Sequence, residues 1–330
     1  MKAPSFWSRP PDDPGVLARA LTPASWIWQC VSTLRQRRAR PEIAPVPVLC
    51  IGNLIAGGSG KTPMVAALIR RLTEQGIAAH VVSRGHGGRL TGPHRVDQSR
   101  DTVEEVGDEP LMLAAEAPVW IAHNRPAGAR AAAATGAQLI LLDDGFQNPH
   151  LTKDASILMV DAAVGFGNCR VIPAGPLREP IKPGLARADL IVLAGADQDR
   201  SKALQTWPDL ASRPYVEAEF VPLDTGMIMP GDPVFAFAGI GYPEKFFSTL
   251  RAMGADLVGT RSFPDHHRYP PAILRRMIVD AHARNAMLVT TEKDAVRLPP
   301  SFRREVMTLQ VRLQPSDWAP VDRLIAGLLR

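Results

Sequence analysis

A glycine-rich segment that ends in Gly-Lys-Thr is the part of this sequence best suited to chemistry on phosphates. Residues 46–62 read VPVLCIGNLIAGGSGKT, and apolar residues at helical spacing follow directly. A strand, a glycine-rich loop and a helix in this order present backbone N–H groups and the positive end of the helix dipole to an anion. Lys61 would reach the β- and γ-phosphates, and the Thr62 hydroxyl would hold Mg²⁺. The segment predicts binding of ATP or GTP, with further contacts from Gly57, Gly58, Ser59, Gly60 and Pro63.

One position of the loop departs from the usual nucleotide-binding pattern. Ile55 stands where that pattern has its first glycine, and Gly57 and Gly58 supply the flexibility instead. An ordinary glycine-rich turn between a strand and a helix is the alternative interpretation. The nucleotide site is favoured because the lysine, the hydroxyl and the strand–helix context coincide.

Two adjacent carboxylates could complete a metal site. The segment QLILLDDGFQ over 138–147 is an apolar run that ends in Asp143 and Asp144. Folds with a Gly-Lys-Thr loop place such an acid beside Mg²⁺. We expect Thr62 and one of the two aspartates to hold the metal, and the sequence leaves open which aspartate it is.

Phosphoryl transfer to a hydroxyl also needs a group that takes the proton. Asp108 lies in a Gly-Asp-Glu-Pro turn and is the first candidate base. Because an apolar helical pattern follows it, a helix N-cap is an equally good interpretation. Arg84 and Arg178 are candidates for bidentate contacts with phosphate or substrate oxygens. The alternative for Arg178 is an ion pair with the adjacent Glu179.

The elements that must position these residues alternate between strand and helix patterns. Such alternation predicts a mostly parallel sheet covered by helices on both faces, an α/β fold of the P-loop NTPase type. Strands are expected over 79–83, 118–122, 138–143, 157–160 and 190–193, and helices over 108–116 and 125–135.

A second, smaller α/β unit follows. Its expected elements are strands over 234–238, 256–260 and 287–291 and helices over 243–253 and 271–284. Two further segments alternate apolar and polar residues, which predicts strands with one solvated face. These segments, 215–221 and 307–313, are expected to form a two-stranded linker. The domains would be residues 1–214 and 215–315, with a C-terminal helix over 316–330 that packs back on the first domain.

Length and composition indicate a globular protein with a large core. The chain has 330 residues and a net charge of +5, and its apolar and charged fractions are those of folded domains. Cys30, Cys50 and Cys169 are too few and too scattered for a disulfide framework or a zinc site, which fits a reducing compartment. No apolar run approaches the ~20 residues of a membrane span. The N-terminus lacks a signal-peptide pattern, so a cytoplasmic location is expected.

The N-terminal region combines tryptophans with arginines. Ile27, Val31 and Leu34 share a helical face beside Trp26, and residues 31–40 carry four arginines and no acid. Such a helix suits a membrane interface, and packing on the protein body is the alternative. The arginines are not followed by an aromatic-interleaved basic face or a helix-turn-helix pattern, so nucleic acid is not an expected partner.

These segments, with several others in order, resemble the tetraacyldisaccharide 4′-kinase family of lipid A biosynthesis. The matching motifs run from about residue 46 to 298, which makes them more specific than the phosphate loop alone. They are Gly52-Asn53 through Gly-Gly-Ser-Gly-Lys-Thr-Pro63, Ser83-Arg-Gly85, Gly107-Asp-Glu-Pro110, Leu142-Asp-Asp-Gly-Phe-Gln147, Pro173-Ala-Gly-Pro-Leu-Arg-Glu179, Phe237-Ala-Gly-Ile-Gly241, Phe263-Pro-Asp-His266 and Thr291-Glu-Lys-Asp294. The family also lacks the first loop glycine, which accounts for Ile55.

The resemblance implies transfer of the γ-phosphate of ATP, with Mg²⁺, to the 4′-hydroxyl of an acylated glucosamine disaccharide. It implies that Asp108 is the base with His266 as its partner, and that Arg84, Gln147, Arg178 and Glu179 bind substrate. The lipid substrate lies in the inner leaflet of a bacterial inner membrane. The N-terminal helix would therefore hold a peripheral enzyme on the cytoplasmic face of that membrane.

Two positions depart from the family pattern, and two other functions compete with the kinase. His86 replaces the tyrosine of Ser-Arg-Gly-Tyr, and Asn148 replaces the histidine of Asp-Gly-Phe-Gln-His. A membrane-associated nucleotide switch should carry a guanine-reading segment, but residues 291–294 have the wrong spacing for one. A small-metabolite kinase would leave the amphipathic N-terminus unexplained.

Overall fold

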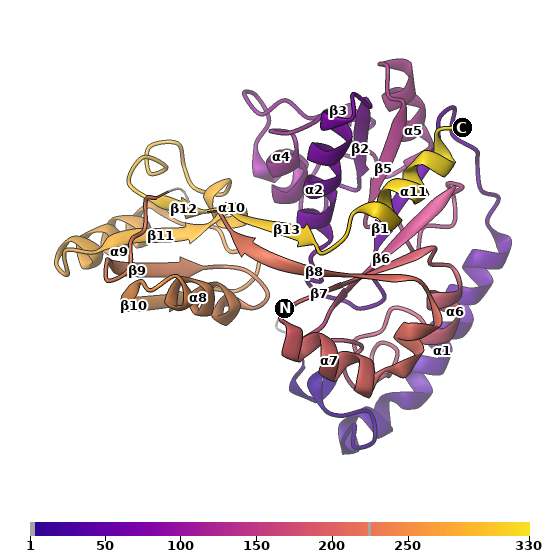
Figure 1. Ribbon diagram of the computed structural model, residues 1–330, viewed down its shortest axis with the longest axis horizontal. Helices are drawn as coiled ribbons and strands as arrows, with labels where there is room; N and C mark the ends of the chain where they lie inside the picture. Colours follow the sequence, from indigo (N-terminus) through magenta and orange to yellow (C-terminus); the bar gives the residue numbers. More distant parts are fainter. Residues whose placement is uncertain (1–3, 224–225) are drawn as a thin grey trace.

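Two lobes of unequal size make up the molecule, as the computed structural model in Figure 1 shows. The structure describes residues 4–223 and 226–330. The larger lobe is built on a nine-stranded sheet and the smaller lobe on a four-stranded sheet. The predicted domains include residues 1–3 and 224–225, which lie outside the described residues. The predicted division of the chain at residues 214 and 315 stays a prediction.

The larger sheet is parallel except at its two edges, where β3 and β13 run antiparallel to their neighbours. Its strand order is β13-β8-β7-β6-β1-β5-β2-β4-β3. The strands are β1 (Val48–Gly52), β2 (Ala79–Ser83), β3 (His94–Arg95), β4 (Val119–Ile121), β5 (Leu139–Asp143), β6 (Ala155–Asp161), β7 (Leu190–Ala194), β8 (Tyr215–Pro222) and β13 (Val311–Pro315). Six of these strands, β2 and β4 to β8, were expected within two residues at each end. The first five were found from their continuous apolar runs, and β8 was found from its alternating pattern.

Helices cover both faces of this sheet, as predicted. Alternate residues of β1 point to opposite faces: Leu49 and Ile51 pack with α2, α4 and α11, whereas Val48 and Cys50 pack with α5, α6 and α7. The helices of this lobe are α1 (Val16–Arg38), α2 (Lys61–Glu74), α3 (Val103–Val106), α4 (Asp108–Leu113), α5 (Arg125–Ala134), α6 (Ile181–Ala186), α7 (Asp197–Thr206) and α11 (Ala319–Leu328), with short 3₁₀ turns at Ser5–Ser8 and Pro208–Ser212.

The smaller lobe is a parallel sheet of order β10-β9-β11-β12 with helices on both faces. Its elements are β9 (Pro233–Ala238), α8 (Pro243–Ala252), β10 (Asp256–Ser262), α9 (Pro271–His282), β11 (Met287–Thr291), α10 (Glu292–Ala295) and β12 (Met307–Leu309). The expected strands and long helices of this unit are confirmed. The short helix α10 was not expected, and it carries side chains of the site described below.

The segment 307–313 was predicted as one strand, and that prediction is wrong. The chain passes from β12 in the smaller sheet to β13 in the larger sheet at Gln310, whose carbonyl accepts a hydrogen bond from Leu223 N at 2.9 Å. Its period-two pattern is the same in both pieces, so the pattern could not show that two different sheets share the segment. The two lobes are therefore joined at Gln310 and after β8.

The C-terminal helix α11 lies against the larger lobe, on the face that carries α2 (Figure 1). Val321 and Ile325 are buried in the same apolar cluster as α2. Arg71 of α2 donates to Asp322 at 2.6 Å. The helix therefore packs on the larger lobe, on the face of the sheet that carries α2.

Candidate active site

The phosphate loop connects β1 to α2 at the carboxyl end of the larger sheet. Gly60 precedes α2 in a left-handed conformation with φ of 79°, and a Cβ atom there would lie 2.7 Å from the Phe220 ring. Only glycine fits both the conformation and the contact. Cβ atoms at Gly57 and Gly58 would meet nothing within 4 Å, so this part of the loop borders open space that a ligand could occupy.

Ile55 has a structural reason to replace the usual glycine. Its side chain is 5% exposed, and its backbone forms an antiparallel bridge with Leu177. Arg178 N donates to Leu54 O at 2.7 Å on one side of this bridge, and Ala56 N donates to Pro176 O at 2.8 Å on the other. The start of the loop is thereby fixed to the segment that carries Arg178.

Lys61 and Arg178 both face the carboxylate of Asp144. Lys61 Nζ lies 3.7 Å from Asp144 Oδ1, and Arg178 contacts both carboxylate oxygens, at 2.8 and 3.2 Å. Burial alone would raise the pKa of Asp144, but the charges of Lys61 and Arg178 outweigh it and lower the pKa below its ordinary value. Asp144 is therefore an ionised, paired acid.

Asp143 is in a different environment, although it is the adjacent residue. It is 1% exposed, its Oδ2 accepts a hydrogen bond from Ser83 Oγ at 3.3 Å, and its Oδ1 has no partner among the described residues. Burial, together with the charges of Glu109 and Asp144, raises the pKa of Asp143 to about 7. A buried carboxylate oxygen without a donor fits a cation site.

These residues fit Mg²⁺ in the manner expected of a nucleotide site. Thr62 is buried at the start of α2, and the hydroxyl of Ser59 is buried without a partner among the described residues. No group of three or more acidic, histidine or cysteine side chains converges on a metal position in the described parts of the chain. Mg²⁺ commonly uses one or two protein ligands together with substrate phosphates and water, so Thr62 and Asp143 would suffice.

The predicted substrate residues Gln147, Arg178 and Glu179 belong to one network. The amide of Gln147 accepts from Arg178 Nη1 at 3.2 Å and donates to Glu179 Oε1 at 3.0 Å. Glu179 is paired with Arg187 at 2.5 Å. The alternative of an Arg178–Glu179 ion pair is not what the structure contains, because Arg178 turns to Asp144 instead. Arg84 is exposed and has no hydrogen bond or ion pair among the described residues.

A buried arginine that the sequence analysis did not identify lies near the two aspartates. Arg125 is 4% exposed, its Nη1 donates to Ala122 O at 2.7 Å, and its Nε has no partner among the described residues. The charges of Asp143 and Asp144 act on this guanidinium. The sequence gives no distinctive signal for Arg125, because an arginine in the first turn of an alanine-rich helix is common.

Asp108 of the larger lobe meets His266 of the smaller lobe. His266 Nδ1 lies 3.0 Å from Asp108 Oδ2, and the two residues are separated by 158 positions. Asp108 is 2% exposed, whereas 39% of the His266 side chain is exposed. Asp108 is the first residue of α4, and Gly107 is the N-cap. The N-cap interpretation of Asp108 is therefore wrong.

Two cations of the smaller lobe complete this contact: Lys293 lies in the Thr291–Asp294 motif but was assigned no role from the sequence, and Arg297 was not singled out. Arg297 donates to Asp108 Oδ2 from Nε at 3.0 Å, and Lys293 Nζ lies 3.3 Å from Glu109 and 3.9 Å from Asp108. Burial would raise the pKa of Asp108, but the His266 hydrogen bond and the charges of Lys293 and Arg297 hold it well below its ordinary value. Asp108 is therefore ionised in this structure.

Of the two departures from the family pattern, His86 lies in the site and Asn148 lies beside it. The ring of His86 is 5.8 Å from that of His266, edge to face. Asn148 caps its own turn, since its side chain accepts from His150 N at 2.9 Å, and its carbonyl accepts from Lys153 at 2.6 Å. His86 is thus the departure that contacts His266.

The segment Thr291–Asp294 does not read a nucleotide base. Asp294 is fully buried and accepts hydrogen bonds from Gly239 N, Tyr269 Oη and Thr291 Oγ1 at 2.7–3.0 Å. A guanine-reading aspartate must be free to face the base. The buried and fully bonded Asp294 is therefore inconsistent with a guanine-binding nucleotide switch.

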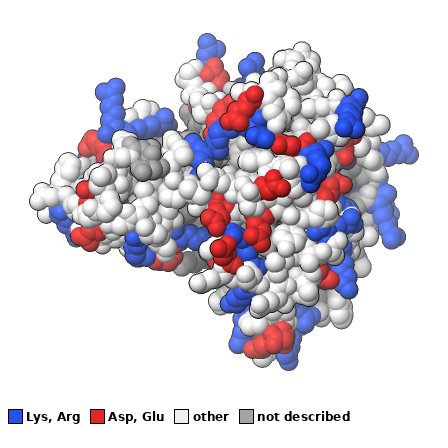
Figure 2. Space-filling model, viewed as in Figure 1, with Lys and Arg blue, Asp and Glu red and all other residues white. Residues whose placement is uncertain are grey.

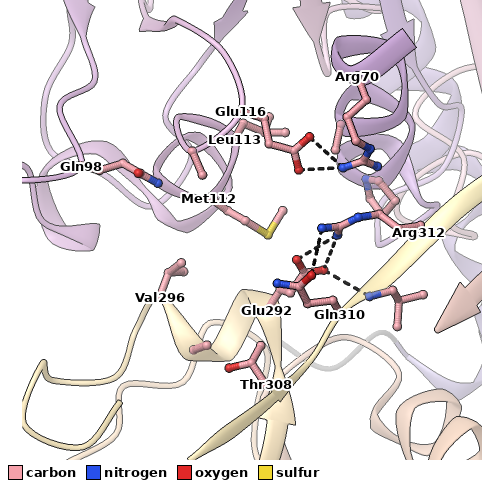
Figure 3. A pocket seen from close by; sticks show the side chains of 15 residues that line it. Arg70, Gln98, Met112, Leu113, Glu116, Glu292, Val296, Thr308, Gln310 and Arg312 are labelled. Atoms are coloured by element: carbon pink, nitrogen blue, oxygen red, sulfur yellow. Dashed lines mark hydrogen bonds and ion pairs between the residues drawn. The ribbon is translucent and has the colours of Figure 1, made fainter. Parts of the chain in front are cut away.

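A pocket of about 390 Å³ lies between the lobes, and Pro63, Ala66 and Arg70 of α2 line one side of it (Figure 3). Arg70 pairs with Glu116 at 2.7 Å on one wall, and Arg312 pairs with Glu292 at 3.0 Å on another. The pocket excludes Lys61, Asp108 and Asp143, and its charges neutralise one another. It therefore marks the junction of the lobes near Gln310 and is not the reaction site.

The fold and the site together define a P-loop kinase: a Gly-Lys-Thr loop and a buried carboxylate lie at the carboxyl end of a P-loop NTPase-type sheet, and an acid–histidine pair joins the two lobes beside them. Residues 17–330 match the model of the tetraacyldisaccharide-1-P 4′-kinase family, LpxK. The chain belongs to this family.

Similar proteins extend this result over the whole chain. Tetraacyldisaccharide 4′-kinase of Jannaschia sp. is 48% identical over 100% of this chain and 99% of its own length. The protein of the same name from Rhodospirillum centenum is 52% identical over 100% and 97%. A crystal structure of LpxK from Aquifex aeolicus in complex with ATP superposes with a TM-score of 0.77 and 25% identity, over 96% of this chain and 100% of that chain.

Proposed function

We propose that this chain transfers the γ-phosphoryl group of ATP to the 4′-hydroxyl of a tetraacylated glucosamine disaccharide 1-phosphate. The observation that carries this function is the Asp108–His266 contact at 3.0 Å. Together with the family membership, it supplies the proton acceptor that transfer to a hydroxyl requires. The product is the 4′-phosphate of a lipid A precursor.

The phosphate end of the reaction is assigned to the loop and to β5. Lys61, freed from Asp144 by the nucleotide, neutralises the β- and γ-phosphate oxygens, and the backbone N–H groups of 57–60 surround them. Thr62 and Asp143 would hold Mg²⁺, which supplies further charge neutralisation at the same oxygens when bound. Asp144 keeps Arg178 in place near the transferred group.

The acceptor end is assigned to the junction of the lobes. Asp108 and His266 act as one unit that takes the proton of the 4′-hydroxyl as it attacks. Because the two residues come from different lobes, the unit exists only when the lobes meet. Arg84, Gln147, Arg178 and Glu179 are proposed to bind substrate oxygens. Arg84 is the residue of this set with an unpaired guanidinium, which suits an anionic substrate group.

Membrane binding is assigned to α1. Trp26, Ile27 and Val31 are more than 60% exposed, and Arg35, Arg37 and Arg38 lie in the last turn of the helix. The other side of α1 is fixed to the body of the protein, because Ser25 Oγ donates to Val171 O at 2.7 Å and Trp28 Nε1 donates to Arg178 O at 3.2 Å. An apolar face with a tryptophan and flanking arginines suits the boundary of an anionic bilayer.

We place the protein on the cytoplasmic face of the inner membrane as a peripheral enzyme. Among residues 4–223 and 226–330, the structure contains no helix that is both long and apolar enough to cross a bilayer. On the face drawn in Figure 2, basic and acidic side chains are interspersed over the larger lobe. This face lacks the continuous basic surface expected of a nucleic-acid partner.

One assay tests the proposed function. The purified protein is incubated with labelled ATP, Mg²⁺ and the acylated disaccharide 1-phosphate, and in parallel with a water-soluble disaccharide and with no acceptor. We expect label to appear in the acylated product alone. Equal transfer to the soluble sugar would support a small-metabolite kinase, and release of phosphate without an acceptor would support a nucleotide hydrolase or switch.

A further inference from the structure

We propose that Arg297 is a positioning residue for the transfer, one that holds Asp108 as an anion so that His266 offers Nε2 to the acceptor hydroxyl. The inference rests on the proposed function and concerns a side chain that the sequence analysis did not single out. Arg297 follows α10 in the smaller lobe, and only 4% of its side chain is exposed.

The guanidinium of Arg297 is fixed on the smaller lobe and directed at the larger one. Its Nη1 donates to Gly239 O at 2.8 Å and to Asp294 Oδ1 at 3.0 Å. Its Nε and Nη2 both donate to Asp108 Oδ2. Asp294 is itself held by three hydrogen bonds, so the fork cannot turn without breaking buried contacts. Arg297 therefore reaches Asp108 in a single orientation.

The hydrogen bonds of Asp108 leave it little capacity to act as a base by itself. Its Oδ2 accepts from Arg297 and His266, and its Oδ1 accepts from Glu109 N at 3.0 Å. The side chain is 2% exposed, so burial keeps an acceptor hydroxyl from approaching its carboxylate directly. An ionised carboxylate only accepts hydrogen bonds, so the contact between Asp108 Oδ2 and His266 Nδ1 requires the proton to be on Nδ1.

His266 is the member of the pair that an acceptor can reach. With a proton on Nδ1, the neutral imidazole has Nε2 as its acceptor atom. Asp265 Oδ2 lies 3.7 Å from this atom and would stabilise the cation that forms when Nε2 takes the proton. The buried carboxylate of Asp108 therefore orients the imidazole of His266, and the exposed imidazole takes the proton.

A cation is needed because the surroundings of Asp108 are rich in acids. Glu109, Asp265 and Asp294 lie around the pair, against Lys293 and Arg297, and the His86 ring packs on His266. Lys293 cannot take over the role of Arg297, because its ammonium is 3.9 Å from Asp108 and is shared with Glu109 and Asp265. Without Arg297, burial would favour a protonated Asp108, which no longer accepts from Nδ1.

The test compares Arg297→Gln and Arg297→Lys with the wild type from about pH 5 to about pH 9, measuring kcat and KM on the acylated disaccharide. Arg297→Gln should lower kcat by ~10–100-fold, the range for residues that orient a reacting group. Loss of the cation raises the proton affinity of the pair, so the acid limb of kcat should move to higher pH. KM for ATP should change little.

Arg297→Lys keeps the charge but not the fork. It should leave the acid limb near its wild-type position while kcat falls, and it serves as the second variant if Arg297→Gln folds poorly. Arg303→Gln is the matched control: Arg303 lies on the same lobe and bonds only to the carbonyls of Leu298 and Val296 among the described residues. Its kinetics should equal those of the wild type.

Two results would overturn the inference. If both Arg297 variants have wild-type kinetics, Arg297 has no role in the transfer. If kcat falls by the same factor at every pH, Arg297 only stabilises the contact between the lobes. Failure of the proposed function is a separate result. It would appear as a wild-type protein that does not phosphorylate the acylated disaccharide, or as an Asp108→Ala protein with full activity.

Discussion

The ammonium of Lys61 lies 3.7 Å from Asp144 Oδ1, so the lysine that we propose to bind phosphate faces one of the two acids at the end of β5. Arg178 pairs with the same carboxylate. Phosphate oxygens that enter the loop must compete with Asp144 for Lys61, whereas Asp144 retains Arg178. Asp143 Oδ1 has no partner among the described residues, so Asp143 is the acid that we propose as the metal ligand. The two adjacent aspartates are thereby expected to differ in function.

Lys61→Ala should remove most of the kinase activity and leave the fold intact. Loss of a cation aimed at charge that develops in the transition state costs ~10²–10³-fold in kcat. Steady-state kinetics and circular dichroism are the measurements, with Lys182→Ala as the control because Lys182 is an exposed lysine of α6. Near-normal turnover by folded Lys61→Ala protein would contradict the assigned nucleotide site.

Asp143→Asn should lower the affinity for Mg²⁺, whereas Asp144→Asn should weaken the ion pair that positions Arg178. We expect Asp143→Asn to raise the Mg²⁺ concentration needed for half-maximal activity by ~10–100-fold, since a metal ligand loses its charge. Asp144→Asn should shift this value much less and should raise KM for the lipid. Mg²⁺ titrations at saturating ATP check the difference, and equal shifts in the two variants would mean that both acids hold the metal.

Asp108→Ala and His266→Ala should each lower kcat by ~10²–10⁴-fold, the usual contribution of a positioned proton acceptor. If the two residues act as the proposed unit, the double variant should lose little beyond the worse single variant. Binding of ATP should be nearly unchanged in all three proteins, as the proton moves only in the transition state. Losses that multiply in the double variant would show that Asp108 and His266 act independently.

Asp108→Asn should destabilise the protein by about 3 kcal/mol at pH 7, because it leaves buried cations without a charged partner. The pKa of Asp108 is below its ordinary value, so its stabilising effect is present above pH ~4 and is lost only as the pH falls further. Urea unfolding at several pH values is the measurement, with Asp256→Asn as the exposed control. A difference that already fades between about pH 7 and about pH 5 would argue against a lowered pKa.

The arginines at the end of α1 should contribute to membrane binding. Replacing Arg35, Arg37, Arg38 and Arg40 with Gln should weaken binding to anionic vesicles by about 1 kcal/mol per arginine at low salt, and by less at high salt. Sedimentation with vesicles is the measurement. The control replaces four exposed arginines elsewhere, namely Arg275, Arg276, Arg304 and Arg323. Equal pelleting of both variants and the wild type would leave α1 as a helix packed on the protein.

The sequence alone determined the phosphate loop, the acid-ended strand β5 and nearly every strand and long helix of both lobes. These features depend on local order along the chain: apolar periodicity, a glycine-rich turn and a strand followed at once by a helix. The family motifs also brought Asp108 and His266 together as a prediction, although no local pattern relates residues so far apart.

The tertiary structure alone decided which charges are paired. Arg178 pairs with Asp144 and not with its neighbour Glu179, segment 307–313 divides between two sheets, and Arg125 and Arg297 are buried beside reacting acids. Each outcome depends on distances between segments that are remote in sequence, and the energy of a charge pair depends on distance and burial. Periodicity carries no information on either quantity, so these contacts could be found only after the two lobes were folded and placed together.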